Sequence, residues 1–129
     1  MLVYEFSLPA SLRLPLRLGV GAYALFIVWA SLRPAGTGGA IPHLDKVLHL
    51  SVYALLSLGL ALAWPKLSKF RIFWGCLVFG LALEVGQGTM GSGRTASFWD
   101  GAANSLGAAI GLGAVVLLSR LFAKGKNSL

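Results

Sequence analysis

The sequence predicts an all-α fold, an integral membrane bundle of four helices that forms a single domain over residues 1–129. Hydrophobic residues make up 57% of the chain and charged residues only 12%, whereas about 25% of the residues in a soluble domain are charged. Four apolar stretches, at about 16–32, 47–64, 70–85 and 101–122, approach the ~20 residues that a transmembrane helix needs. Prolines and glycines separate these stretches, as is typical of helix ends and turns.

The first stretch follows a basic segment, as the apolar part of a secretory signal peptide does. That segment holds Arg13 and Arg17, but it is long, contains Pro9 and Pro15, and precedes an apolar run longer than that of a usual signal. We therefore expect a retained helix over residues 16–32.

The second stretch ends at Trp64-Pro65-Lys66 and the third at Gly86-Gln87-Gly88. After the third, the sequence predicts a loop over residues 86–99 that is too long for a tight hairpin. Its glycines can turn backbone N–H groups toward an anion, and Arg94 adds a donor suited to phosphate or carboxylate. A flexible loop without a ligand explains the same pattern equally well.

The fourth stretch carries Gly107 and Gly111, a spacing that lets the backbone of a neighbouring helix come close. The single cysteine, Cys76, lies inside the third stretch, so no internal disulfide can form and we expect a small packing residue.

The cations predict the orientation of the bundle. With four crossings, both termini and the loop at 65–71 share one side of the membrane, and the opposite side holds only Arg33, Lys46 and Arg94. Cytoplasmic segments of membrane proteins are enriched in Lys and Arg, so both termini are expected in the cytoplasm of a bacterial inner membrane. Lipid contacts and orientation account for the net charge of +7, and no nucleic-acid partner is expected. The cations on the cytoplasmic side are Arg13, Arg17, Lys66, Lys69, Arg71, Arg120, Lys124 and Lys126.

Polar residues gather on the other side, at the ends of the apolar stretches. Asp45, His49 and Tyr53 form one stripe along the second helix, and Asp100 and Asn104 form another along the fourth. The two stripes can face each other. Ionisable residues inside a membrane are costly, so their convergence on one face indicates a functional site.

Each of these residues also has a purely structural interpretation. Asp45 can cap its helix, and Ser97 and Asp100 have the spacing of a capping box. Glu84 needs a partner, because an unpaired carboxylate in the membrane costs several kcal/mol, and Arg94, Lys46 or His49 can supply it.

Two motifs in this chain resemble those of VanZ-like membrane proteins. Residues 42–53 resemble the signature P-x-x-D-K-x-x-H-x-x-x-Y, and residues 84–107 are similar to the element E-x-x-Q … R-x-x-S-x-x-D-x-x-x-N-x-x-G. The resemblance covers about 41–113. It implies a small multi-helix protein of the bacterial cell envelope and a link to antibiotic resistance, because the founding member gives low-level resistance to teicoplanin.

The first functional hypothesis is an outward site that binds or processes an anionic envelope component, such as a lipid-linked phosphate, a cell-wall precursor or a glycopeptide-related ligand. Cations would hold the anion, carboxylates would position the cations, and a histidine with a reference pKa of ~6.5 would act as general base. The predicted catalytic residues are His49, Glu84 and Asp100, and the predicted ligand-binding residues are Asp45, Lys46, Gln87, Arg94, Ser97 and Asn104.

Two other functions fit the same residues. The chain is alternatively a structural or accessory subunit whose polar cluster is an internal salt-bridge network, with a membrane protein partner or a second copy of itself. A metal-dependent hydrolase is less favoured, because one histidine among three carboxylates is a poor zinc set and no H-E-x-x-H spacing occurs. No cofactor or metal is predicted.

Overall fold

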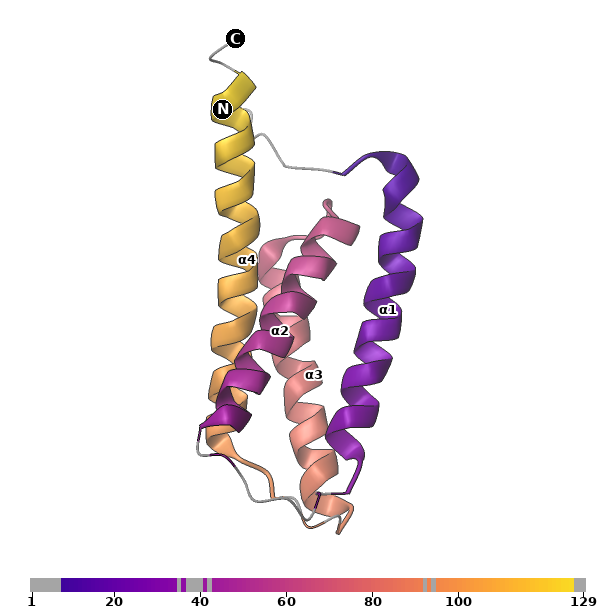
Figure 1. Cartoon of the computed structure of the whole chain (residues 1–129), viewed down its shortest axis with the longest axis vertical. Coiled ribbons are helices and arrows are strands. Elements are labelled where there is room, and N and C mark those ends of the chain that lie inside the picture. The colour runs from indigo at the N-terminus through magenta and orange to yellow at the C-terminus, as the bar shows by residue number, and fades with distance from the viewer. Residues whose placement is uncertain are drawn as a thin grey trace.

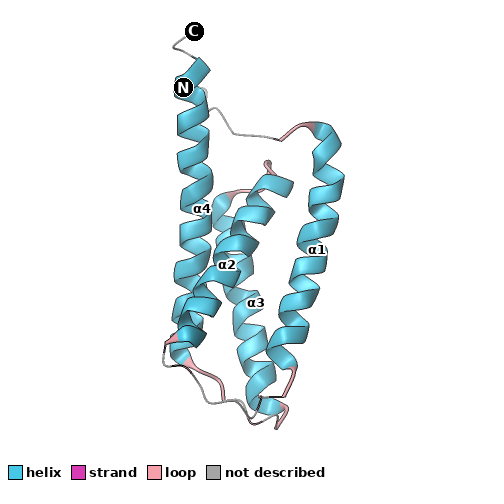
Figure 2. Ribbon diagram, viewed as in Figure 1, coloured by secondary structure: helices cyan, strands magenta, loops and turns pink. Residues whose placement is uncertain are grey.

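The computed structural model describes residues 8–34, 36, 41, 43–91, 93 and 95–126, without the side chains of 124–126. These residues form four helices and no strand: α1 (Ala10–Leu32), α2 (Leu44–Ala63), α3 (Lys69–Thr89) and α4 (Phe98–Lys126) (Figure 2). Each helix is long and apolar enough to cross a membrane. The predicted all-α class and the four predicted helices are thereby confirmed.

The helices run alternately in opposite directions along the bundle (Figure 1). The starts of α2 and α4 and the ends of α1 and α3 lie together at one end, which we call the motif end. The start of α1, the turn between α2 and α3, and the end of α4 lie toward the opposite end. This arrangement puts the two polar motifs of the sequence at one end of the bundle.

α1 begins earlier than the sequence indicates, at Ala10 instead of near residue 16, and it includes Pro15. A proline inside a helix removes one backbone donor. Contacts to the end of α2 hold this part of the helix, since Arg17 Nε donates to the carbonyl of Ala63 at 3.1 Å and the guanidinium lies 5.4 Å from the centre of the Trp64 ring. The helix therefore includes part of the basic segment that precedes the predicted apolar stretch.

The predicted end of the third helix at residue 85 is wrong, because α3 continues through Gly86 and Gln87 to Thr89. Gly86 gives α1 room: a Cβ at this position would lie 3.1 Å from Leu32 Cδ2. Gln87 Nε2 donates to the carbonyl of Ser31 at 2.9 Å. This glycine permits a close helix contact instead of ending the helix, and tertiary packing overrides its low helix propensity.

The connection from α3 to α4 is consequently shorter than the predicted loop and spans only 90–97. Gly91 and Gly93 turn the chain there with positive φ angles of 61° and 74°. The predicted anion nest includes Arg94, which lies outside the described residues, so the nest stays a prediction.

The closest helix pair is α2 with α4. A Cβ on Gly107 would collide with the carbonyl oxygen of Leu50, and one on Gly111 would collide with the carbonyl of Ala54 and the hydroxyl of Ser57. The predicted close approach at these glycines is confirmed. It fixes the register of α2 against α4, and so fixes which polar side chains meet at the motif end.

α1 is the most peripheral helix: it contacts α2 and α3 and has few buried residues. The core lies mainly among the other three helices, with Val20 and Ile27 added from α1, and includes Tyr53, Ile72 and Cys76, each at most 3% exposed. The expected packing role of Cys76 is confirmed by this burial, and Tyr53 of the polar stripe is a core residue as well.

Candidate functional site

The site begins at the first turn of α2. His43 occupies the N-cap in a left-handed conformation (φ 66°), and Asp45 follows in the first turn. Asp45 is therefore not the N-cap residue, which was one of its two interpretations from the sequence. A carboxylate in the first turn still complements the helix dipole, and the Asp45 side chain is 61% exposed.

Lys46 connects α2 to α4 by an ion pair. Its ammonium group contacts the Asp100 carboxylate Oδ1 and also donates to Asp45 Oδ2 at 3.0 Å. The Asp100 side chain is only 10% exposed, whereas that of Lys46 is 39% exposed. The lysine thus neutralises a largely buried carboxylate while it still reaches the surface.

His49 makes the second connection between α2 and α4. Its Nδ1 lies 2.9 Å from Asn104 Oδ1. Because an amide oxygen can only accept, Nδ1 carries the proton of this bond. Nε2 then faces Asp45 Oδ1 and Asp100 Oδ2, each at 3.7 Å. The predicted meeting of the two polar stripes is confirmed by these contacts, and we call Asp45, Lys46, His49, Asp100 and Asn104 the α2–α4 cluster.

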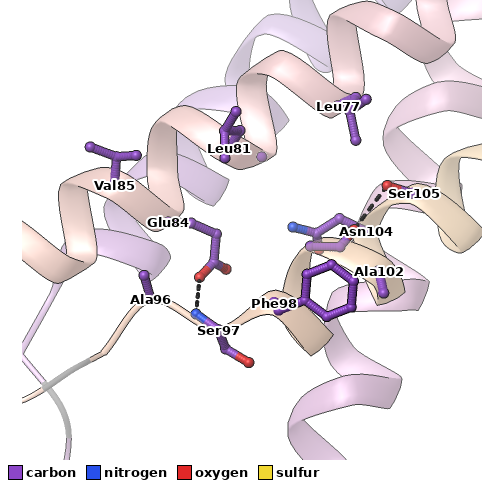
Figure 3. A pocket seen from close by; sticks show the side chains of 12 residues that line it. Leu77, Leu81, Glu84, Val85, Ala96, Ser97, Phe98, Ala102, Asn104 and Ser105 are labelled. Carbon is purple, nitrogen blue, oxygen red and sulfur yellow. Dashed lines mark hydrogen bonds between the residues drawn. The ribbon is translucent and has the colours of Figure 1, made fainter.

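The predicted capping box at the start of α4 is half correct. Ser97 Oγ accepts from the backbone N–H of Asp100 at 3.4 Å, as in a capping box. The reciprocal bond is different: the backbone N–H of Ser97 donates to Glu84 Oε2 of α3 at 2.9 Å (Figure 3). The Asp100 carboxylate is therefore turned toward Lys46 and His49 instead of folding back on its own helix.

Glu84 and Gln87 do not join the α2–α4 cluster. Both side chains are buried, and both bind backbone groups, Ser97 N–H and Ser31 C=O respectively. Of the expected partners of Glu84, Lys46 and His49 contact other side chains and Arg94 lies outside the described residues; the structure gives Glu84 the N–H group that precedes α4. No sequence pattern marks Ser31 or the Ser97 N–H as partners, because both are backbone groups of distant segments.

Three side chains of the cluster have the spacing of metal ligands. One ligand atom each of Asp45, His49 and Asp100 lies within 4.8 Å of the others. The Lys46 ammonium already contacts both carboxylates, so a side chain supplies the positive charge that a metal ion would bring.

A pocket of about 520 Å³ lies beside the cluster, between α3 and α4. Glu84 and Asn104 line its inner part, with apolar side chains such as Leu77, Leu81 and Phe98 around them (Figure 3). The sequence did not predict this pocket, whose lining includes the small residues Gly80, Gly101 and Ala102; we call it the lateral pocket.

Fold and site together define a small four-helix membrane protein with a charged cluster at one end of the bundle. The sequence model of the VanZ/LLP1 family matches residues 10–119. The chain belongs to this family, as its two motifs indicated. Neither a curated protein nor a solved structure matches it.

Proposed function

We propose that this protein binds or processes an anionic component of the bacterial envelope at the α2–α4 cluster, on the outer face of the inner membrane. One observation carries the proposal. The N-termini of α2 and α4 meet at Lys46 and His49, and both of these side chains are partly exposed. Helix N-termini favour anions through their dipole and their N–H groups.

The cluster retains donors for an anion even though its charges are paired. Lys46 carries three N–H donors, of which two are directed to Asp45 and Asp100. The exposed fraction of this side chain leaves the third accessible from the motif end. Asp45 and Asp100 hold the ammonium in place, so the anion binds a lysine that is already oriented.

If a reaction takes place, His49 is the group that exchanges the proton. Asn104 fixes the ring through Nδ1, which leaves Nε2 as the site of protonation in the neutral imidazole. Two carboxylate oxygens lie 3.7 Å from Nε2. This arrangement is that of a general base held by one side chain, with two carboxylates beside its reactive nitrogen.

The proposed outward orientation of the α2–α4 cluster follows from the distribution of Lys and Arg between the two ends of the bundle. Lys66, Lys69 and Arg71 lie in or beside the turn between α2 and α3, at the opposite end from the cluster. The positive-inside rule assigns that end to the cytoplasm. The cluster then faces the periplasmic side, where cell-wall precursors and glycopeptides such as teicoplanin act.

A second function is favoured by a separate observation, that several polar side chains bind partners within the protein. Lys46 with Asp100, Glu84 with Ser97, and Gln87 with Ser31 each join two helices. A structural or accessory subunit would need such bonds and no ligand. The exposure of Asp45 and Lys46 favours the binding function, because a network that only joins helices has no need to reach the surface.

The test compares Lys46→Met with Lys66→Met, which removes an exposed lysine at the opposite end of the bundle. Lipids and glycans that copurify with each variant are measured by mass spectrometry, and teicoplanin resistance is measured in cells that produce it. The proposal predicts that Lys46→Met loses a phosphorylated component and the resistance, while Lys66→Met keeps both. Equal profiles for the two variants would contradict it. Melting curves of both variants in detergent show whether any loss follows from unfolding.

A further inference from the structure

The lateral pocket opens on the side of the bundle. Leu81, Val85 and Phe98 lie along it and are 63%, 56% and 82% exposed. All three belong to helices apolar enough to cross a membrane, so hydrocarbon surrounds this surface when the helices are embedded. A chain can enter the pocket sideways without leaving the bilayer.

The inner part of the pocket is polar, and contacts with the described residues leave part of the hydrogen-bonding capacity of its polar atoms unused. Glu84 is 6% exposed and Asn104 is 3% exposed. Within the described residues, Glu84 accepts a single hydrogen bond, at Oε2. Asn104 uses Oδ1 for His49, and its Nδ2 has no acceptor among the described residues; the nitrogen lies 3.0 Å from the point where a Cβ on Gly80 would be.

Hydrocarbon alone is a poor occupant for this interior, because buried polar groups without partners cost ~1–3 kcal/mol each. An aqueous solute is a poor occupant for the rest of the lining, which is mostly apolar. The volume falls within the usual range for small-molecule sites, ~300–1,000 Å³. Lining and size both fit an amphiphile.

We propose that the lateral pocket binds one hydrocarbon chain of a membrane amphiphile, with a hydrogen-bonding group of its head placed between Glu84 Oε1 and Asn104 Nδ2. The carboxylate takes a donor such as a hydroxyl, amide or amine, and the amide nitrogen takes an acceptor. The chain lies along Leu77 and Leu81, deeper in the bundle. This ligand is distinct from the anion proposed for the α2–α4 cluster, because Glu84 alone is charged among the described residues that line the pocket, and no lysine offsets its charge there.

Asn104 joins the pocket to the cluster, because one amide group contacts His49 and faces the pocket. An acceptor bound at Nδ2 fixes the orientation of this amide, and with it the proton on His49 Nδ1. Occupancy of the pocket therefore favours the His49 tautomer that carries its proton on Nδ1.

The test uses an uncharged diacylglycerol, whose free hydroxyl can donate to Glu84, with a photoactivatable diazirine in one acyl chain, incorporated into vesicles with the purified full-length protein. Gly101→Leu fills the pocket, because Gly101 lines it and a Cβ there meets nothing within 4 Å. Gly113→Leu is the matched control, on the same helix, with the same free space, and outside the pocket lining. Crosslinked peptides are mapped by mass spectrometry.

We expect crosslinks concentrated on 77–85 and 96–105 in the wild type and in Gly113→Leu, and their loss in Gly101→Leu. Ala102→Leu fills the same pocket without replacing a glycine, and loss of the same crosslinks is expected. Crosslinks spread evenly over all four helices, or unchanged in both pocket variants, would overturn the proposal. So would a change in subunit number in the pocket variants with unchanged lipid labelling, because a second protein copy would then be the occupant.

Discussion

Glu84 of α3 accepts a hydrogen bond from the backbone N–H of Ser97, the residue that precedes α4, at 2.9 Å. In a capping box the acidic residue three positions after the cap makes this bond. Here a carboxylate from another helix makes it, which leaves Asp100 available to Lys46 and His49. One interhelical bond thus fixes the start of α4 and orients the α2–α4 cluster.

Glu84→Ala should destabilise the protein by ~1–3 kcal/mol, because the partly buried backbone N–H of Ser97 loses its acceptor. Glu84→Gln should cost clearly less, since the amide oxygen can accept the same bond. Thermal melting in detergent measures both, with Val85→Ala, an exposed neighbour on α3, as the control. Equal losses for the Ala and Gln variants would show that the Ser97 bond is not the reason for the effect.

Gly107→Ala and Gly111→Ala should each cost at least ~1–3 kcal/mol, because the added methyl collides with the α2 backbone. Gly113→Ala, on the same helix but with nothing within 4 Å of its Cβ, should change the stability by no more than ~1 kcal/mol. The yield of folded protein and its melting temperature check this contrast. A Gly107→Ala protein that melts like Gly113→Ala would mean that α2 and α4 are farther apart.

Lys46→Met and Asp100→Asn should each destabilise the bundle, because each removes one partner of the ion pair between α2 and α4. Removing one partner of a fully buried pair costs ~3–5 kcal/mol; the exposure of Lys46 reduces the expected cost to ~1–3 kcal/mol. The double variant should lose less than the sum of the two. A double-mutant cycle from melting curves measures this coupling, and additive losses would indicate that the two side chains do not interact.

Gln87→Ala should lower stability by ~1 kcal/mol, since the carbonyl of Ser31 at the end of α1 loses its donor. We expect it to leave the binding of the anionic component unchanged, because Gln87 lies outside the α2–α4 cluster. Melting temperature and copurifying lipids are measured on the same preparation. Loss of the bound component at an unchanged melting temperature would place Gln87 among the ligand-binding residues.

Much of the fold follows from the sequence because membrane helices leave strong local signals. Apolar runs of about the right length gave the four helices, and the spacing of Gly107 and Gly111 gave the closest helix contact. The facing stripes were predictable too, since helical periodicity places Asp45 and His49 on one side of α2.

The differences from the sequence predictions share one cause. In each case a contact between distant segments determined the local structure, and the neighbouring residues in the sequence do not show that contact. Gly86 signals a helix end in isolation, but in the bundle it makes room for Leu32. Glu84 binds the backbone N–H of Ser97, a partner that carries no signature in the sequence. The lateral pocket depends on small residues from two helices and becomes visible only when the helices are packed.

The proposal that the α2–α4 cluster faces the periplasm is tested most directly by thiol labelling in intact cells. Cys76 is the only cysteine and is buried, so Cys76→Ala provides a background without thiols. Thr95→Cys places a thiol in the exposed connection between α3 and α4, and Lys66→Cys places one in the exposed turn between α2 and α3. We predict that a membrane-impermeant maleimide labels the Thr95→Cys protein from outside, and the Lys66→Cys protein only after the inner membrane is permeabilised. The reverse pattern would contradict the outward site.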